Sequence, residues 1–330
     1  MIELQQEHTT TTIRIYACGG AGVNIVSQFK MLNGSLVKIS ADSFSTTHSS
    51  FIDTSRSDLN HMHSEDEVYI IPGLDGQGKK RGLSIDTIRS HIPDIMFKHA
   101  PEEVNIVVHS AGGGSGAVLG PLIVNEIMKR GLIVVPIVVE CTSSAIEVKN
   151  TLDTLVSYAN FSKSHNKPLV MSWHEQKPGK SMTEVDNDIK FIIAILSTMF
   201  SGNNRKLDSA DLKNWLDYTK VTGFEPELAM LRVSIPSESY ADVATACTLL
   251  PIGVEPPSID VPYHCYGYMP EDVSGAIMHG SVSGPVVNTV RLGAFDAIAK
   301  RLQASNAKHT ERMSVRKASN LGSAGADLVF

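Results

Sequence analysis

Up to about residue 200, apolar positions form short runs separated by longer amphipathic segments. The short runs predict strands, and apolar residues at helical spacing between them predict helices. The predicted strands cover residues 13–17, 36–40, 68–71, 105–108, 132–139 and 169–173, and the predicted helices follow residue 24 and cover 83–98, 117–130 and 145–161. Strands that alternate with helices predict an α/β fold with a doubly wound, mostly parallel sheet.

A long helix over residues 184–200 comes next, and it is apolar nearly all round after Lys190. That pattern is typical of a central helix between two domains. Beyond it, Asp208 is well placed to cap the start of a helix that ends near Tyr218. Asp211 stands three residues later, where an acid in a first helical turn is also favoured by the helix dipole.

From Leu228 onward the pattern predicts a smaller α+β domain. We expect strands at 230–235, 261–269 and 274–281, a helix at 240–250 and a C-terminal helix from 290 to about 313. A tail rich in Gly, Ser and Ala follows, which we expect to be disordered when free. The predicted parts are an N-terminal extension (1–12), a nucleotide-binding domain (13–180), the central helix (181–202), an acidic loop with its helix (203–225), the α+β domain (226–290), the C-terminal helix (291–317) and a flexible tail (318–330).

Composition narrows the class of protein. The 330 residues carry a formal net charge of −6, which gives no reason to expect direct nucleic-acid binding, although basic residues gather between Lys300 and Lys317. Four scattered cysteines predict neither a zinc site nor a disulfide scaffold. No apolar run is long enough to span a membrane, and the polar N-terminus does not resemble a signal peptide. We therefore expect a cytoplasmic protein.

The strongest candidate site is a glycine-rich loop between the strand at 105–108 and the next helix. Four glycines in five residues allow the backbone to approach a ligand, and the following helix N-terminus favours an anion such as phosphate. The loop consists of Ala111, Gly112, Gly113, Gly114, Ser115 and Gly116. A tight structural turn is the alternative interpretation.

Two further loops have the same position relative to a strand. Residues 18–24 read Cys-Gly-Gly-Ala-Gly-Val-Asn and open a helix, as in a dinucleotide-binding Rossmann unit, but the third glycine of that fingerprint is missing. Residues 73–82 contain four glycines and three basic residues. That loop is either a plain turn or a cover over a polyphosphate. In a doubly wound sheet all these loops meet at the carboxyl ends of the strands.

The order of these parts resembles the tubulin/FtsZ family of self-assembling GTPases, and the chain looks most like phage-encoded tubulins of the PhuZ type. Residues 112–116 are similar to the family's Gly-Gly-Gly-Thr-Gly phosphate loop, with Ser115 in place of Thr. The resemblance covers about residues 13–220 well and the remainder only in outline. It implies GTP or GDP as ligand, with Mg²⁺ held through phosphates and water rather than by protein side chains.

The resemblance also implies roles for individual residues. Asn187 is the expected contact to the guanine base, Glu147 and Asn150 the expected contacts to the ribose, and Asp208 and Asp211 the expected catalytic pair. The remaining expected nucleotide contacts are Gly19, Gly20, Ala21, Gly22, Asn24, Asp42, Gly76, Ala111, Gly112, Gly113, Gly114, Ser115 and Gly116. The acidic pair can also be aligned as Asp211 and Asn214. Lys206 stands where an asparagine is usual.

In the family that this chain resembles, the acidic loop belongs to the next subunit along a filament. The resemblance therefore implies a GTPase that polymerises head to tail, with hydrolysis completed in trans. We further expect lateral contacts through the C-terminal tail and a role in positioning phage DNA or phage compartments in the host cytoplasm. A nucleotide-binding filament protein without turnover is one alternative, and a Rossmann-type oxidoreductase is another.

Overall fold

The computed structural model describes residues 11–31, 47–56, 59, 63–176, 179–201, 204, 206–234, 239–269 and 285–323. The predicted strands at 36–40 and 274–281, most of the predicted N-terminal extension and the end of the tail lie outside these residues.

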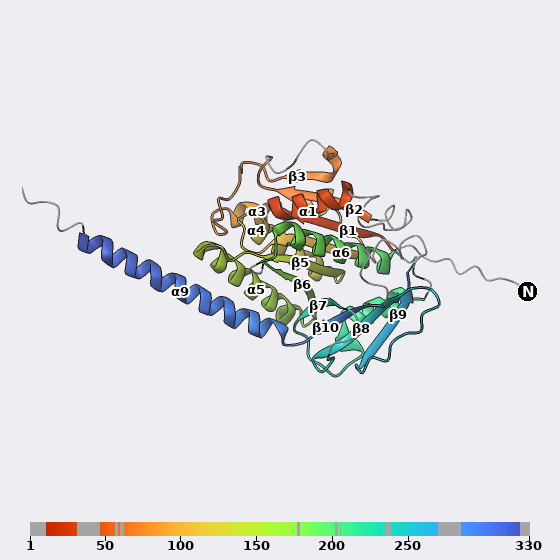
Figure 1. Ribbon diagram of the computed structural model, residues 1–330. Coiled ribbons are helices and arrows are strands. Elements are labelled where there is room, and N and C mark those ends of the chain that lie inside the picture. Colours follow the sequence, from red (N-terminus) through yellow and green to blue (C-terminus); the bar gives the residue numbers. More distant parts are fainter. Residues whose placement is uncertain are drawn as a thin grey trace, which may run out of the picture.

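A ten-stranded sheet runs through the described chain in the order β3-β2-β1-β4-β5-β6-β7-β10-β8-β9 (Figure 1). The first seven strands are parallel, β10 is antiparallel to β7 and β8, and β9 is parallel to β8. The strands are β1 (Ile13–Cys18), β2 (Thr47–Asp53), β3 (Val68–Ile70), β4 (Val104–Ser110), β5 (Ile133–Glu140), β6 (Leu169–Glu175), β7 (Leu228–Ser234), β8 (Val243–Leu250), β9 (Tyr263–Tyr268) and β10 (Val286–Arg291). The predicted α/β class with a mostly parallel sheet is confirmed.

Helices cover both faces of the sheet, which buries alternate strand residues in two apolar cores. One face packs against α1 (Gly19–Met31) and α6 (Met182–Phe200). The other packs against α3 (Ile85–Lys98), α4 (Gly116–Lys129), α5 (Ala145–His165) and the start of α9 (Ala294–Ser323). The short helix α7 (Ser209–Leu216) packs on β8 and β9. The described chain also contains two 3₁₀ turns, η1 (Glu65–Glu67) and η2 (Tyr218–Lys220). Among the described helices, none combines the length and apolar character needed to cross a bilayer.

The connection order creates a switch point between β1 and β4. From β1 the chain builds outward to β2 and β3, then returns and builds outward from β4 on the other side. The two central strands end together, because Cys18 pairs in register with His109. Helices α1 and α4 therefore begin side by side, and a ligand site is expected in the crevice between them.

The predicted helix at 240–250 is wrong, because residues Val243–Leu250 form strand β8. All eight residues of this strand are buried between β10 and β9. A short apolar run does not distinguish a buried strand from a helix, and here pairing with β10 and β9 decided for the strand.

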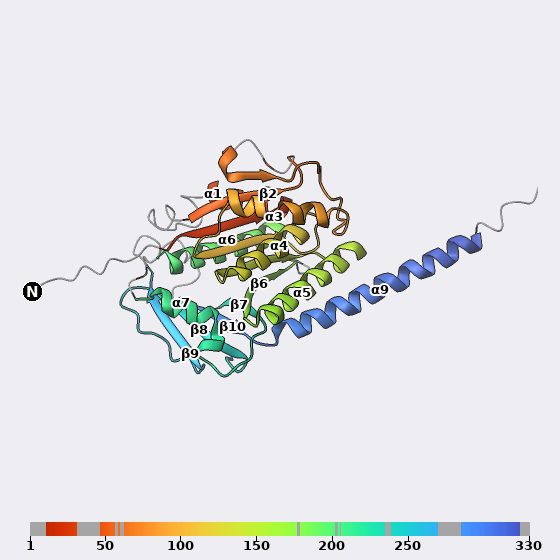
Figure 2. The ribbon, with the colours of Figure 1, turned by 180° about the vertical axis from the view of Figure 1, so that it is seen from behind.

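The C-terminal helix also differs from its predicted bounds. Val290 lies in β10, and the helix starts at Ala294 after Gly293, whose φ of 63° ends the strand. It then continues to Ser323, beyond the predicted ends near 313 and 317. No proline interrupts this stretch, and its Ala, Lys and Arg residues favour helix. In both views α9 leaves the body of the molecule and projects well beyond it (Figures 1 and 2).

Candidate functional site

A cavity of about 490 Å³ lies at the carboxyl ends of the central strands, at the switch point of the sheet. The first turns of α1 and α4 border it, and so does the loop between β3 and α3. Nine of the residues predicted to bind nucleotide line this cavity: Gly19, Gly20, Ala21, Gly76, Gly113, Gly114, Ser115, Gly116 and Glu147. The three glycine-containing loops found in the sequence therefore meet around one space.

Close backbone packing explains two of the glycines. Gly19 has a φ of 69°, and a Cβ there would lie 2.5 Å from the backbone nitrogen of Gly116. A Cβ on Gly114 would lie 2.3 Å from the Cβ of Gln77, on the β3–α3 loop. Side chains at these two positions would push the loops apart. The cavity thus depends on glycine where the loops touch as well as where a ligand would approach.

Two helix N-termini face this cavity, and both favour an anion. The side chains at the cavity contribute both a positive and a negative charge, because Lys79 forms an ion pair with Glu147 at 2.7 Å. The hydrogen bond that Lys79 donates to Glu147, together with the negative charge of Glu147, raises the pKa of Lys79. Burial raises the pKa of Glu147, but hydrogen bonding and charge from Lys79 outweigh that effect, so the net shift is downward. Both groups are therefore charged at neutral pH, and Lys79 is within reach of an anionic ligand.

Hydroxyl groups connect the loops around the cavity. The hydroxyls of Thr54 and Ser115 lie 2.5 Å apart, which joins the end of β2 to the start of α4. Ser55 donates to Asp75 at 2.9 Å. Ser110 accepts a hydrogen bond from the backbone N–H of Gly113 at 3.2 Å. These bonds hold the glycine-rich loop against its neighbours.

Three predicted contacts in the glycine-rich loops lie behind the cavity rather than on it. Ala111 is fully buried. A Cβ on Gly112 would lie 2.6 Å from the Cβ of Cys141, and one on Gly22 would lie 2.2 Å from the carbonyl oxygen of Val108. Gly22 therefore allows α1 to pack closely on β4. Contacts of these three residues with a nucleotide stay predictions.

Asn150 is buried and supports the loops. Its amide nitrogen donates to the carbonyl oxygens of Lys79, Gly112 and Gly113 at 2.8, 3.1 and 3.3 Å. The side chain thereby connects α5 to the glycine-rich loop and to the β3–α3 loop. Its predicted contact with a ribose stays a prediction.

The predicted base contact, Asn187, is exposed on α6. One turn further along α6, Lys190 donates to Gln28 of α1 at 3.1 Å, and Gln28 donates to Asn24 at 3.2 Å. Asn24 and Asn187 thus lie on neighbouring helices, but neither lines the cavity. Asp42 falls outside the described residues, and its role stays a prediction.

The predicted catalytic acids lie at the opposite end of the sheet. Helix α6 starts after the carboxyl end of β6 and its 19 residues run back roughly 28 Å toward the amino ends of the strands. There, Lys213 of α7 lies 4.0 Å from Glu103, just before β4. Asp208 and Asp211 stand at the start of α7 and are therefore remote from the cavity at the carboxyl ends of the strands.

Both acids have structural partners. Asp208 accepts hydrogen bonds from the backbone N–H groups of Ala210 and Asp211 at 2.8 and 2.9 Å. Asp211 accepts from the backbone N–H of Asp208 and, at 3.0 Å, from the hydroxyl of Tyr263. The predicted cap at Asp208 is confirmed, and the pair forms a capping box.

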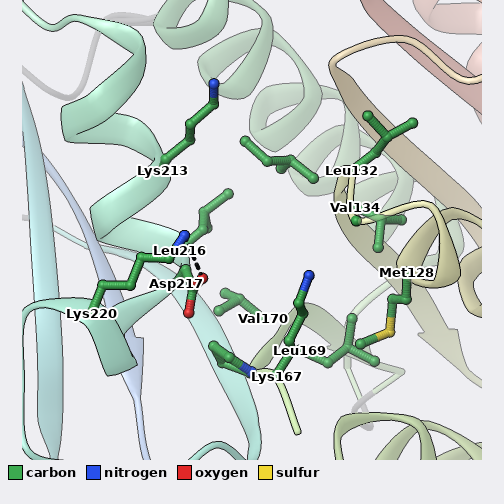
Figure 3. A pocket seen from close by; sticks show the side chains of 13 residues that line it. Met128, Leu132, Val134, Lys167, Leu169, Val170, Lys213, Leu216, Asp217 and Lys220 are labelled. Carbon is green, nitrogen blue, oxygen red and sulfur yellow. Dashed lines mark ion pairs between the residues drawn. The ribbon is translucent and has the colours of Figure 1, made fainter. Parts of the chain in front are cut away.

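A smaller hollow of about 160 Å³ lies near α7, at the amino ends of β5 and β6 (Figure 3). Its floor is apolar, with Leu132 and Leu169 among the lining side chains. Lys167, Lys213 and Lys220 stand around it, and Lys220 pairs with Asp217 at 2.8 Å. The acidic-loop end of the molecule therefore also carries positive charge.

Several cavity-lining residues were not among the predicted contacts: Cys18, Ser55, Asp75, Gln77, Gly78, Lys79, Ser110 and Cys141. Five of them lie in the loops at residues 18–24 and 73–82 that the sequence singled out, and Ser110 directly precedes the glycine-rich loop. Ser55 had no such signal, because its strand β2 begins with polar residues and was not predicted.

Comparisons with known proteins agree with this architecture. The chain is 30% identical over 222 residues to a phage tubulin-like protein of Pseudomonas phage PhiPA3, covering 67% of this chain and 66% of that protein. It is 29% identical over 220 residues to a phage tubulin-like protein of Pseudomonas phage phiKZ, covering 63% of each. The chain belongs to the tubulin/FtsZ family. No protein-family model matches it.

Solved structures of tubulin-like proteins have the same fold. A protofilament of TubZ from bacteriophage PhiKZ superposes with a TM-score of 0.79 at 23% identity, covering 92% of each chain. The phage tubulin PhuZ with GDP gives a TM-score of 0.77 at 22% identity, again covering 92% of each chain. FtsZ from M. jannaschii gives 0.61 at 17% identity, covering 87% of this chain and 92% of that one. The predicted tubulin/FtsZ-like fold is confirmed.

Proposed function

We propose that this tubulin-like protein binds and hydrolyses GTP and polymerises head to tail, with the acidic loop of one subunit completing the site of the next. The observation that carries this proposal is the separation of the two half-sites. A phosphate cradle lies at the carboxyl ends of the strands, and Asp208 and Asp211 lie at the amino ends. A head-to-tail contact, which does not close on itself, would bring these opposite ends together.

The cavity supports a nucleotide ligand in two ways. Its backbone loops and two helix N-termini suit phosphates, while the neighbouring polar seam of Asn24, Gln28 and Lys190 lies between α1 and α6. Asn187 stands near this seam, and its amide offers both a donor and an acceptor to a guanine edge. GDP accompanies the PhuZ structure with a similar fold.

The residues present also suit Mg²⁺ held mainly by phosphates and water. No cluster of three metal-binding side chains occurs among the described residues. Near the cradle, Asp75 supplies a carboxylate and Ser115 a hydroxyl, the oxygen ligands that Mg²⁺ prefers. A bound Mg²⁺ would neutralise phosphate charge, while Asp208 and Asp211 of the adjoining subunit would orient or deprotonate the attacking water.

Mixing two inactive variants tests completion in trans. Gly113→Asp places a carboxylate in the phosphate cradle with little disturbance, because a Cβ there has no neighbour closer than Ser110 Oγ at 3.5 Å. The double variant Asp208→Asn, Asp211→Asn retains hydrogen-bond acceptors for the cap but removes both charges. Each variant alone should release little phosphate from GTP. An equal mixture should recover up to roughly a quarter of wild-type turnover, from random pairing of intact half-sites.

Asp260→Asn, an exposed change on the β8–β9 connection, is the matched control and should hydrolyse GTP normally. Light scattering on the same samples reports assembly. If the acidic double variant alone hydrolyses GTP at the wild-type rate, the proposed catalytic role is wrong. If the mixture forms copolymer but recovers no GTP turnover, completion of the site in trans is contradicted.

A filament without turnover is a second candidate, and one observation favours it. Asp208 and Asp211 are both engaged in the capping box, and Asp211 is also bound to Tyr263. These contacts alone would account for the two acids. Wild-type polymer that forms with GTP and releases no phosphate would support this candidate over a GTPase.

We also propose that the C-terminal tail makes lateral contacts between filament strands. Helix α9 projects beyond the body and carries basic residues, and the sequence ends in Leu328-Val329-Phe330. Removing residues 319–330 should abolish bundled polymer while GTP binding persists. Normal bundles of the truncated chain, seen by negative-stain microscopy, would reject the idea. We further propose a role in positioning phage DNA or phage compartments in the host cytoplasm; what supports it is that the similar tubulin-like proteins are phage proteins.

A further inference from the structure

The hollow at the amino ends of β5 and β6 combines an apolar floor with a positively charged rim (Figure 3). Its volume is about 160 Å³. An apolar cavity of roughly 150 Å³ can hold a benzene ring, so this hollow is large enough for one side chain of another molecule. Among its described lining residues, Lys167, Lys213 and Lys220 stand against a single carboxylate, that of Asp217.

The three lysines of this rim are exposed and only partly compensated. Lys220 pairs with Asp217 at 2.8 Å, while Lys213 reaches Glu103 only at 4.0 Å. Lys167 forms no ion pair with any residue that the structure describes. The rim therefore favours a partner that carries acidic groups beside an apolar side chain.

Exposed apolar side chains at the cavity end could fill this hollow, because a head-to-tail contact places that end against the amino ends of the next subunit's strands. Three large apolar side chains at this end are exposed by more than a third: Leu83 (69%), Met182 (45%) and Ile146 (38%). Leu83 shortly precedes α3, Ile146 lies in the first turn of α5, and Met182 begins α6. The charges beside each of them decide which one fits a lysine rim.

The surroundings of Leu83 and Ile146 do not complement the rim. Three basic residues at 79–81 shortly precede Leu83. Ile146 has charges of both signs nearby, from Glu147 and Lys149. Lysines around the hollow would repel the first neighbourhood and gain little from the second.

Met182, in contrast, starts an acidic segment. Residues 181–189 contain Glu184, Asp186 and Asp188 and no basic residue. Lys180 pairs with Asp188, but Glu184 and Asp186 form no ion pair with a described residue. Hydrogen bonds from Ser181 lower the pKa of Glu184, so this carboxylate is charged at neutral pH.

Placement along the strands also favours Met182. The hollow includes Leu169 and Val170 at the amino end of β6, and α6 begins shortly after the carboxyl end of that strand. Two subunits displaced along the strand direction would therefore bring the start of one α6 to the other's hollow. The same displacement would bring a phosphate cavity toward the acids at the start of α7, and Lys213 of α7 borders the hollow.

We propose that the start of α6 in one subunit docks on the hollow of the next, with Met182 in the apolar floor and Glu184 and Asp186 facing the lysines. This inference rests on the proposed head-to-tail polymer and names side chains that hold it together. Burial of Met182 supplies affinity, while the complementary charges fix how the two subunits are aligned.

Cysteine crosslinking tests this contact in polymer formed with GTP. Met182→Cys combined with Leu132→Cys places a thiol on each side of the contact, so a short bismaleimide should give a ladder of covalent oligomers. Leu83→Cys combined with Leu132→Cys is the matched control, because it moves the first thiol to another exposed apolar position at the cavity end, and it should give no ladder. A mixture of the single variants Met182→Cys and Leu132→Cys should give dimers, which shows that the link joins two chains.

Loss of the contact should also raise the critical concentration for assembly, measured by pelleting with GTP. Met182→Lys removes the apolar side chain and is repelled by the rim, and we expect a rise of about tenfold. Lys167→Glu opposes the acids of α6 and should give about fivefold. Val156→Lys changes an apolar residue of similar exposure (49%) on α5 and should change the value less than about twofold. Calorimetry with GTPγS below the critical concentration verifies that each variant folds and binds nucleotide.

Polymer of the Met182→Cys, Leu132→Cys chain that gives no ladder would overturn the docking of α6, and so would an equal ladder from the Leu83→Cys control. Unchanged critical concentrations in both Met182→Lys and Lys167→Glu would overturn it as well. All three results leave GTP binding, turnover and assembly of the wild type intact. A wild-type chain that neither pellets with GTP nor releases phosphate would instead overturn the proposed function itself.

Discussion

The cavity end and the acidic-loop end of this molecule are held together by different kinds of contact. At the cavity, buried groups far apart in sequence meet, as when Asn150 binds loop carbonyls of Lys79 and Gly112. At the other end, Asp208 is exposed and binds within its own helical turn, while Asp211 is half-buried and also accepts a hydrogen bond from Tyr263 of β9. The cavity is thus formed by the folding of one subunit. The acidic loop is held mainly by its own capping box, with one contact from β9, and its proposed chemistry needs a second subunit.

The largest expected difference between the two ends concerns ion pairs. At the cavity end, Arg301 of α9 makes two 2.7 Å hydrogen bonds to Glu140, a carboxylate that is 1% exposed and also accepts from Trp173. Arg301→Ala leaves that buried charge poorly compensated, and we expect a loss of about 3 kcal/mol in the free energy of unfolding.

The matched change at the acidic-loop end is Lys213→Ala, which removes an exposed pair with Glu103. This change should lower the free energy of unfolding by less than about 0.5 kcal/mol. Urea unfolding measures both, and hydrogen exchange should show faster opening of α9 only in Arg301→Ala. Similar losses in the two variants would show that the two ends do not differ in this way.

A second prediction compares adjacent glycines within the cavity. Gly114→Ala forces its Cβ against Gln77, whereas Gly113→Ala finds its nearest neighbour, Ser110 Oγ, at 3.5 Å. We expect Gly114→Ala to weaken GDP binding by about 100-fold, because the loops must separate, and Gly113→Ala by less than about fivefold. Calorimetric titration with GDP distinguishes the two. Equal affinities would mean that close packing of the loops does not shape the site.

A third prediction uses pH. Burial lowers the pKa of His109, under the glycine-rich loop, to about 4; its backbone bond to Ser110 opposes the shift and Arg81 adds to it. In the unfolded chain a histidine takes up a proton near pH 6.5. The contribution of neutral His109 to stability is therefore complete above pH 6.5 and is lost as the pH falls from there toward 4.

When the pH falls from 7.5 to 5.5, the titration of His109 should lower the free energy of unfolding by about 1 kcal/mol. His109→Gln can still bond to Tyr158 but cannot titrate, so urea unfolding should show a smaller loss over that interval. His99, whose pKa burial also lowers to about 4, titrates in both proteins and cancels from the difference. An identical loss in the variant would contradict the role of His109.

The smallest expected effect separates the structural role of Asp208, which caps α7, from its proposed role in GTP hydrolysis. Asp208→Ala removes the N-cap of α7 and should cost about 1 kcal/mol, while Asp208→Asn should be nearly neutral, because asparagine caps as well as aspartate. Thermal melts measure this difference. GTP turnover should fall in both variants, since both lack the carboxylate. Wild-type turnover in Asp208→Asn would limit Asp208 to a structural role.

Local patterns in the sequence predicted most of the parallel half of the sheet and its glycine-rich loops. Strand runs followed by glycines are short-range signals, and they placed Gly19, Gly76 and Gly113 correctly on one cavity. The same approach failed at residues 243–250, because whether an apolar run becomes a strand or a helix depended on neighbours distant in sequence. It also missed β2, whose first half is polar.

By itself, then, the sequence determined the family, the alternation of strands and helices in the parallel part of the sheet, and the glycine-rich loops that follow its central strands, since each depends on residues close together in the chain. Only the tertiary structure decided that Asn150 supports the loops from behind, that the amide of Gln77 is buried beside the cavity with no hydrogen-bond partner among the described residues, and that the two acids stand at the far end of α6. Those properties arise from contacts between elements separated by many residues, which local patterns do not specify.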